Sequence, residues 1–111
     1  MKPLEGLVVL DMTRVLAGPF AAMMFADLGA KVIKIERPDG GDDTRAYPPF
    51  QKGESAYFMS LNRGKRSVTL NLKHPRGKEI LKDLAKKSDI LIENFKPGTM
   101  QRLGLGYADL A

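Results

Sequence analysis

The beginning of the chain limits the possible folds most strongly, because two short apolar segments flank a helix-forming one. Residues 7–10 form a continuous apolar run, which is typical of a strand buried on both faces of a parallel sheet. Gly18 and Pro19 open a stretch, residues 20–28, that is rich in the helix formers Ala, Met and Leu. Residues 31–36 then alternate apolar and polar side chains and predict a second strand. A strand, a helix and a strand within about 30 residues indicate a right-handed βαβ crossover.

The rest of the chain continues this alternation. Residues 67–72 predict a third strand after a turn at 63–66, and Pro75 opens a helix with an apolar stripe. Residues 90–92 predict a fourth, buried strand, whereas residues 55–61 fit a short helix or an extended segment. The order of these elements predicts a doubly wound α/β fold, which is a Rossmann-like open parallel sheet with flanking helices.

Composition excludes several classes of protein. The chain has 111 residues, no cysteine and one histidine, which excludes a disulfide framework, a Cys nucleophile and a thiolate or multi-His metal site. It has no apolar run near the roughly 18 residues of a membrane helix and no signal peptide, so we expect a cytoplasmic protein without a membrane partner. A helix begins at Tyr107 just before the sequence stops, so we expect residues 1–111 to be one domain from a longer chain.

The net charge of +5 is concentrated in one segment. Residues 63–87 carry +7 and the remainder carries −2, which predicts a basic surface and an anionic partner. The alternative is a solvated helix face, which fits Lys78, Lys82, Lys86 and Lys87 best. Nucleic acid is not expected as a partner, because the segment lacks an RNP-like aromatic motif and a zinc finger.

Loops at the carboxyl ends of the predicted strands hold the candidate functional residues, because open α/β sheets bind ligands there. The loops 11–18, 37–43, 70–73 and 93–98 and the segment just beyond them carry cations and donors suited to phosphate: Arg14, Arg37, Lys73, Asn94 and Arg102. The first loop has no G-x-G-x-x-G, which argues against a dinucleotide site. Asp42 and Asp43 are expected to be solvated loop acids, and His74 is expected to flank a helix.

Five stretches occur in order along the chain: V-V-L-D-M-T-R-V-L-A-G-P-F, D-L-G-A-K-V-I-K-I-E-R-P, G-D-D-T-R, N-R-G-K-R-S and E-N-F-K-P-G. Together they closely resemble the N-terminus of the family III CoA-transferases, which include formyl-CoA transferase, carnitine CoA-transferase and α-methylacyl-CoA racemase. Members of this family are longer, so the resemblance implies the N-terminal, CoA-binding part of an enzyme. Coenzyme A would then be a substrate, with no metal.

The resemblance also implies a set of CoA-binding residues, carried over position by position: Val15, Arg37, Leu70, Lys73, Asn94, Phe95 and Arg102. Cations at strand ends fit the pyrophosphate and 3′-phosphate of CoA. Five of these residues also have an alternative role. Val15 and Leu70 also fit a core, Arg37 and Arg102 also fit surface ion pairs, and Asn94 also fits a turn.

The family reaction moves CoA between carboxylates through an aspartate nucleophile, which the resemblance places beyond this chain, so the chain alone is expected to be inactive. Acyl-CoA and a carboxylic acid would be the substrates, and the whole enzyme would be an interlinked homodimer. Leu16 replaces the Gln of formyl-CoA transferase, and R-V-L-A-G-P-F looks more like members that use succinyl-CoA and acids such as glutarate. A racemase of the same fold and a free-standing anion- or nucleic-acid-binding domain remain as alternatives.

Overall fold

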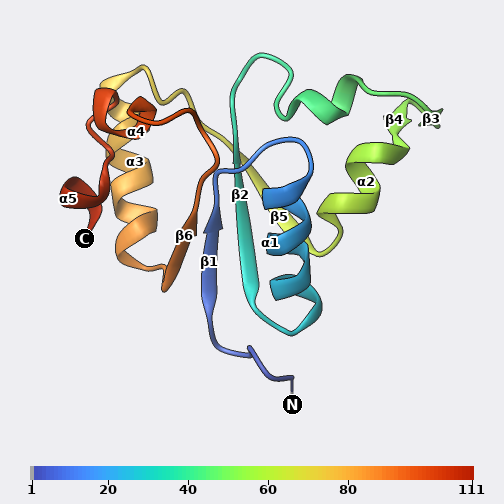
Figure 1. Cartoon of the computed structure of the whole chain (residues 1–111), viewed down its shortest axis with the longest axis horizontal. Helices are drawn as coiled ribbons and strands as arrows, with labels where there is room; N and C mark the ends of the chain where they lie inside the picture. The colour runs from blue at the N-terminus through green and yellow to red at the C-terminus, as the bar shows by residue number, and fades with distance from the viewer. Residues whose placement is uncertain (1) are drawn as a thin grey trace.

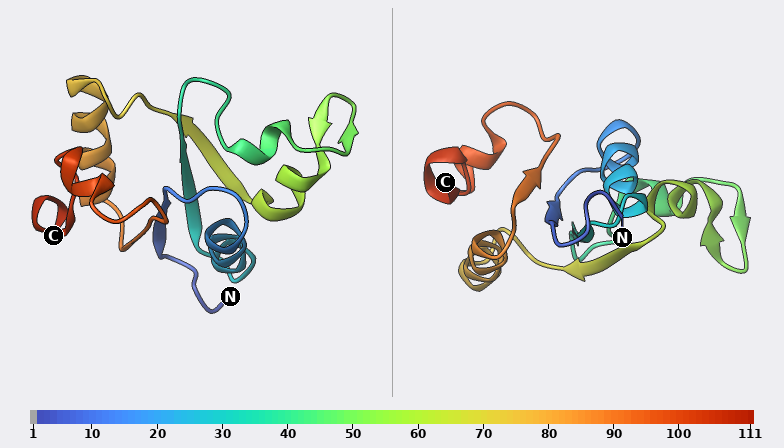
Figure 2. Two further views of the ribbon diagram at one scale, coloured as in Figure 1. Left: turned by 45° about the horizontal axis from the view of Figure 1, so that its top comes forward. Right: turned by 90° about the horizontal axis from the view of Figure 1, so that it is seen from below.

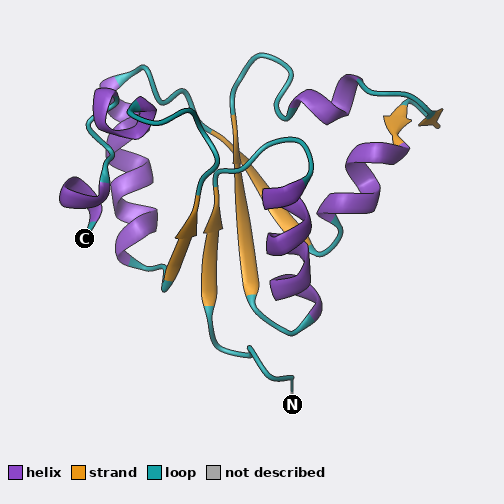
Figure 3. Cartoon of the chain, viewed as in Figure 1, coloured by secondary structure: helices purple, strands orange, loops and turns teal. Residues whose placement is uncertain are grey.

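The computed structural model describes residues 2–111 and contains a four-stranded parallel sheet (Figures 1 and 3). The strands lie in the order β5-β2-β1-β6. The strands β2 and β5 therefore lie on one side of β1, and β6 lies on its other side. Their bounds are β1 (Val8–Asp11), β2 (Lys31–Glu36), β5 (Lys65–Thr69) and β6 (Ile90–Ile92). This order corresponds to strands 3-2-1-4 of the Rossmann fold, and it confirms the predicted open parallel sheet.

Helices cover both faces of the sheet, as a doubly wound fold requires (Figure 2). One face carries α1 (Ala17–Asp27), against which α2 (Ala56–Asn62) packs. The other face carries α3 (Pro75–Lys86) together with the short helices α4 (Thr99–Arg102) and α5 (Tyr107–Leu110). The long segment between β2 and α2 contains a 3-10 turn, η1 (Asp43–Ala46), and a small antiparallel hairpin of β3 (Phe50–Gln51) and β4 (Glu54–Ser55).

Each face of the sheet packs its own apolar cluster, because successive side chains of a strand point to opposite faces. On the α3 face, Leu10 and Ile35 join Leu81 of α3. On the α1 face, Val9 and Val32 join Ala22 of α1. None of the helices between residues 2 and 111 is long and apolar enough to span a bilayer.

Local signals explain where the helices begin. Ser55 caps α2, since its hydroxyl accepts a hydrogen bond from the Phe58 N–H at 3.2 Å, and the ambiguous segment 55–61 is therefore a helix. His74 caps α3, since its Nδ1 accepts from the Arg76 N–H at 3.1 Å, which confirms its expected place beside a helix. Pro75 is the first residue of α3, as predicted.

The third strand lies earlier in the chain than predicted. It covers Lys65–Thr69, so the predicted strand at 67–72 and the predicted turn at 63–66 are both misplaced by about two residues. Lys65 pairs in register with Val32, and its ammonium group is buried. A strand that begins with two basic residues resembles a turn when only its local sequence is considered.

Candidate functional site

A cleft of about 610 Å³ opens at the carboxyl ends of β1, β2 and β5. These strand ends point toward the top of Figure 1. Its apolar lining includes Met12, Ile35 and Leu70. Its charged lining comprises four cations, Arg14, Lys34, Arg37 and Lys73, and three acids, Glu36, Asp39 and Asp42. Lys34 is buried and paired with Asp42, so Arg14, Arg37 and Lys73 are the cations that a ligand can reach. The cleft therefore combines an apolar surface with positive charge at the edge of the sheet where open α/β folds bind ligands.

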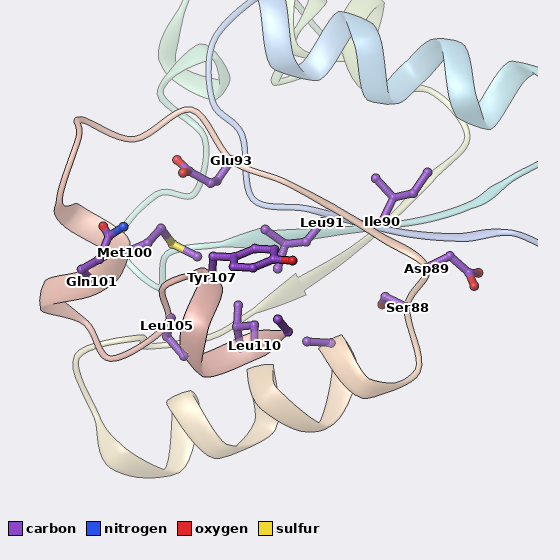
Figure 4. Close-up of a pocket in the computed structure, with 12 residues that line it drawn as sticks. Ser88, Asp89, Ile90, Leu91, Glu93, Met100, Gln101, Leu105, Tyr107 and Leu110 are labelled. Atoms are coloured by element: carbon purple, nitrogen blue, oxygen red, sulfur yellow. The ribbon is translucent and has the colours of Figure 1, made fainter.

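A second cavity, of about 430 Å³, lies between β6 and the helices α3 and α5 (Figure 4). Leu91 of β6 and Leu110 of α5 are among the apolar residues that line it, and Tyr107, which also lines it, is 86% exposed. It contains no Lys or Arg and none of the predicted CoA-binding residues. The cleft at the strand ends is therefore the candidate site.

Four of the seven predicted residues line the cleft: Arg37, Leu70, Lys73 and Phe95. Leu70 is 9% exposed and belongs to the core on the α3 face, as its alternative role predicted. Arg37 donates to Asp43 at 2.7 Å, as its alternative role predicted. Both side chains of this pair are more than a third exposed, and such pairs contribute at most about 1 kcal/mol, so an anionic ligand is able to compete for Arg37.

The other three predicted residues, Val15, Asn94 and Arg102, are not among the residues that line the cleft. The Asn94 amide accepts from the Arg14 N–H at 3.0 Å and donates to the Arg14 carbonyl at 2.9 Å. The Asn94 side chain thus connects the loops that follow β1 and β6, because it bonds both backbone groups of Arg14 as a neighbouring strand would. Arg102 is exposed at the end of α4 and donates to the Thr99 hydroxyl at 3.2 Å.

Four buried charges lie beneath the loop that follows β1. Asp11 and Lys34 are register partners on neighbouring strands, and the Lys34 ammonium lies 2.9 Å from Asp42 Oδ2 and 3.9 Å from Asp11 Oδ2. The Lys65 ammonium donates to Asp11 Oδ2 at 2.7 Å. All four side chains are at most 2% exposed. Two positive and two negative charges therefore compensate one another inside the protein, as buried charges must.

This cluster corrects two predictions. Asp42 is not a solvated loop acid, and Lys65 is not part of a basic surface, because each is paired with a charge that lies elsewhere in the sequence. Burial works against the charged form of Asp42, but hydrogen bonds from the Thr44 N–H and from Lys34 outweigh it and lower the pKa of Asp42. Burial lowers the pKa of Lys65, and its hydrogen bond to Asp11 offsets part of that effect.

The cluster also holds the loop that forms one wall of the cleft. Asp11 Oδ1 accepts from the Thr13 N–H at 2.9 Å, and Lys34 donates to the Thr13 carbonyl at 3.0 Å. Asp42 Oδ1 accepts from the Val15 N–H at 3.2 Å. Val15 has a φ of +75°, which is uncommon for any residue with a side chain and an outlier for a β-branched one. The loop keeps this conformation because its surroundings fix it.

Glu36, at the end of β2, accepts hydrogen bonds from the loop that follows β2 and so fixes that loop beside the cleft. Its two carboxylate oxygens each accept from Arg45 at 2.7 Å, and they also accept from the Ser67 hydroxyl and from the Asp42 N–H. Burial opposes the charge, but these donors outweigh it and lower the pKa of Glu36 to about 2. Both oxygens are occupied, so Glu36 does not offer the free acid that a dinucleotide ribose site needs.

Comparisons with known proteins agree on one family. The profile of CoA-transferase family III matches residues 4–111. Succinyl-CoA:glutarate CoA-transferase of Mus musculus is 58% identical over 111 residues, which cover 99% of this chain and 26% of that protein. Acetyl-CoA:oxalate CoA-transferase of Acetobacter aceti is 50% identical over 98% of this chain and 28% of that protein.

A solved structure has the same fold. A CAIB/BAIF family protein from Brucella suis superimposes with a TM-score of 0.92 at 44% identity, over 98% of this chain and 30% of that one. The chain therefore spans less than a third of the length of each of these relatives.

Proposed function

Because the chain belongs to CoA-transferase family III, we propose that it is the CoA-binding, N-terminal domain of an enzyme that transfers CoA from an acyl-CoA to a carboxylic acid. The names of the mouse and Acetobacter relatives each pair an acyl-CoA with a dicarboxylic acid, glutarate or oxalate. We propose the same class here, with succinyl-CoA as donor and a dicarboxylic acid such as glutarate as acceptor. The whole protein is proposed to be a cytoplasmic homodimer.

The cleft at the strand ends supports this proposal most directly. Coenzyme A carries an adenine ring, a pyrophosphate and a 3′-phosphate, and it needs both apolar surface and cations. Leu70 and Ile35 supply apolar surface, while Arg37 and Lys73 supply positive charge. Phe95 adds an aromatic surface to the same cleft. Val15, Asn94 and Arg102 complete the proposed set, with Asn94 fixing the loop that carries Val15.

The proposed reaction uses an aspartate supplied from outside residues 1–111. Its carboxylate attacks the thioester carbonyl, the C–S bond breaks, and CoA leaves as a thiolate while a mixed anhydride forms. The thiolate then attacks the aspartyl carbonyl of that anhydride, which releases the donor acid and leaves CoA bound to the enzyme as a thioester. The acceptor carboxylate repeats the sequence in reverse. In this scheme the present domain holds CoA, and on its own it transfers nothing.

A calorimetric titration of the purified protein with CoA tests the proposal. Replacing Arg37 with Ala should weaken CoA binding by about 1.5–3 kcal/mol, the range for a hydrogen bond to a charged group. Higher salt should weaken binding by the unaltered protein, because phosphate contacts are screened. Arg63→Ala is the matched control, since Arg63 pairs with Asp27 outside the cleft.

Two outcomes contradict parts of this proposal. If Arg37→Ala binds CoA as tightly as the unaltered protein, Arg37 does not contact CoA. If the unaltered protein shows no CoA binding, the cleft is not a CoA site.

A further inference from the structure

Arg14 is a cleft arginine without an acidic partner. It follows the end of β1, is half-buried and lines the cleft. Four other arginines form ion pairs: Arg37 with Asp43, Arg45 with Glu36, Arg63 with Asp27, and Arg76 with Glu79. Within residues 2–111, no ion pair includes Arg14. Its positive charge is therefore available to a ligand in the cleft.

The backbone around Arg14 is fixed from several directions. The Asn94 amide holds both the N–H and the carbonyl of Arg14. The preceding residue, Thr13, is held by Asp11 and Lys34, and the following residue, Val15, is held in its left-handed conformation by Asp42. A side chain that starts from so rigid a base loses less freedom when it binds, and this pre-organisation favours a binding role.

The side chain of Arg14 is supported as well. Its guanidinium carbon lies 5.3 Å from the centroid of the Phe95 ring, which is within cation–π range. A guanidinium that is supported on its face by an aromatic ring presents its N–H groups along its edge. That edge matches two oxygens of a carboxylate or a phosphate in a bidentate arrangement.

Position in the sheet distinguishes Arg14 from the other cleft cations. Arg14 follows β1 and contacts Phe95 from the loop after β6, whereas Arg37 follows β2 and Lys73 follows β5. Because the strand order is β5-β2-β1-β6, Arg14 and Lys73 lie toward opposite sides of the cleft, with Arg37 between them. Met12 and Leu70 are part of the apolar lining. This arrangement fits a ligand that carries negative charge at both of its ends.

We propose that Arg14 binds the free carboxylate at the far end of a dicarboxylic acyl group, such as the succinyl group of succinyl-CoA. This inference rests on the proposed function, because it takes Arg37 and Lys73 to hold the phosphates of CoA. Arg14 is thus a specificity residue that distinguishes a dicarboxylic acyl-CoA from an uncharged acyl-CoA of the same length.

The test compares three ligands by calorimetric titration: CoA, butyryl-CoA and succinyl-CoA. The last two have acyl chains of equal length, and only succinyl-CoA ends in a carboxylate. The unaltered protein should bind succinyl-CoA roughly 10- to 150-fold more tightly than butyryl-CoA, the range for hydrogen bonds to charged groups. Arg14→Gln should remove this preference and leave the affinity for CoA unchanged.

Two further variants strengthen the test. Arg14→Lys keeps the charge but loses the planar fork, so it should retain part of the preference. It also serves in place of Arg14→Gln if that variant does not fold, as judged by circular dichroism. Arg66→Gln is the charge-matched control, because Arg66 is exposed in β5 and does not line the cleft, and it should retain the full preference.

Each other outcome overturns a specific statement. If Arg14→Gln weakens the binding of all three ligands equally, Arg14 contacts a phosphate of CoA and the inference is wrong. If the preference persists in Arg14→Gln and Arg14→Lys, or if the unaltered protein shows no preference, Arg14 does not bind the acyl carboxylate. If the unaltered protein binds CoA but does not prefer succinyl-CoA to butyryl-CoA, this inference fails and the proposed function stands. If none of the three ligands binds, the proposed function itself fails, and the inference falls with it.

Discussion

Replacing Glu36 with Gln should make the protein less stable at neutral pH, and the loss should depend on pH. Glu36 has a pKa of about 2 in the folded chain, against 4.5 for an unperturbed glutamate. One pKa unit corresponds to about 1.4 kcal/mol, so its ionised form contributes about 3 kcal/mol at neutral pH. The Arg45 side chain is 36% exposed, and screening by water reduces the contribution to about 2–3 kcal/mol.

The sign of the pH dependence follows from the direction of the pKa change. The pKa of Glu36 is lower in the folded state than in the unfolded state, so the stabilisation is fully present above about pH 4.5. It is lost as the pH falls from 4.5 toward 2, because the unfolded chain then binds a proton that the folded chain rejects. Gln has nearly the same size but no charge, so Glu36→Gln removes this pH dependence.

Urea unfolding followed by circular dichroism measures the effect at pH 7, 5, 4 and 3. The difference in unfolding free energy between the unaltered protein and Glu36→Gln should be about 2–3 kcal/mol at pH 7 and about half of that or less at pH 3. The control is Glu79→Gln. Glu79 forms an exposed pair with Arg76 at 2.9 Å, and its loss should change stability by less than about 1 kcal/mol at pH 7.

A difference that is as large at pH 3 as at pH 7 would refute the reasoning. In that case Glu36 would stabilise the fold by its shape and hydrogen bonds, and its charge would contribute nothing. A difference below about 1 kcal/mol at every pH would show that the pairing with Arg45 does not persist in solution.

Two further substitutions test other parts of the structure in the same urea assay. Gly77→Ala should lower stability by about 1–3 kcal/mol, because a Cβ at Gly77 would lie 2.0 Å from the Asn71 carbonyl oxygen. In an ordinary exposed helix the same substitution raises stability by up to about 1 kcal/mol. A gain in stability here would contradict the contact with Asn71. Asp42→Ala should lower the free energy of unfolding by about 3–5 kcal/mol, because it leaves Lys34 without its nearest carboxylate in a buried site. A decrease below about 1 kcal/mol would show that the buried charges are not coupled.

The fold was predictable from the sequence where local pattern and tertiary environment agree. The apolar run at 7–10 overlaps β1, the run at 90–92 coincides with β6, and Pro75 begins α3 as its position predicts. The resemblance to the family also identified cleft residues such as Arg37 and Lys73. These features depend on hydrophobic periodicity, on residues that start helices, or on motifs that are continuous in the sequence.

The pairing of Lys65 with Asp11 was not predictable from local pattern, because the two residues lie far apart in the chain. Lys65 pairs with Asp11, 54 residues earlier, and a lysine after Gly64 reads locally as part of a turn. One signal was present. Lys34 stands in the middle of an apolar strand of a doubly covered parallel sheet, and a lysine there needs a buried carboxylate. Asp42 in the next loop was a candidate for that role.

The loop after β1 is irregular, yet its hydrogen bonds come from nearly every part of the sheet. Asp11 belongs to β1, Lys34 to β2, Asp42 to the loop after β2, and Asn94 to the loop after β6. Loops usually open locally within nanoseconds to microseconds while the rest of a protein stays folded. In this loop, releasing Thr13, Arg14 and Val15 requires the loss of hydrogen bonds to two strands and to two other loops. We therefore expect the wall of the cleft to open less often than a loop that is held only by its own residues.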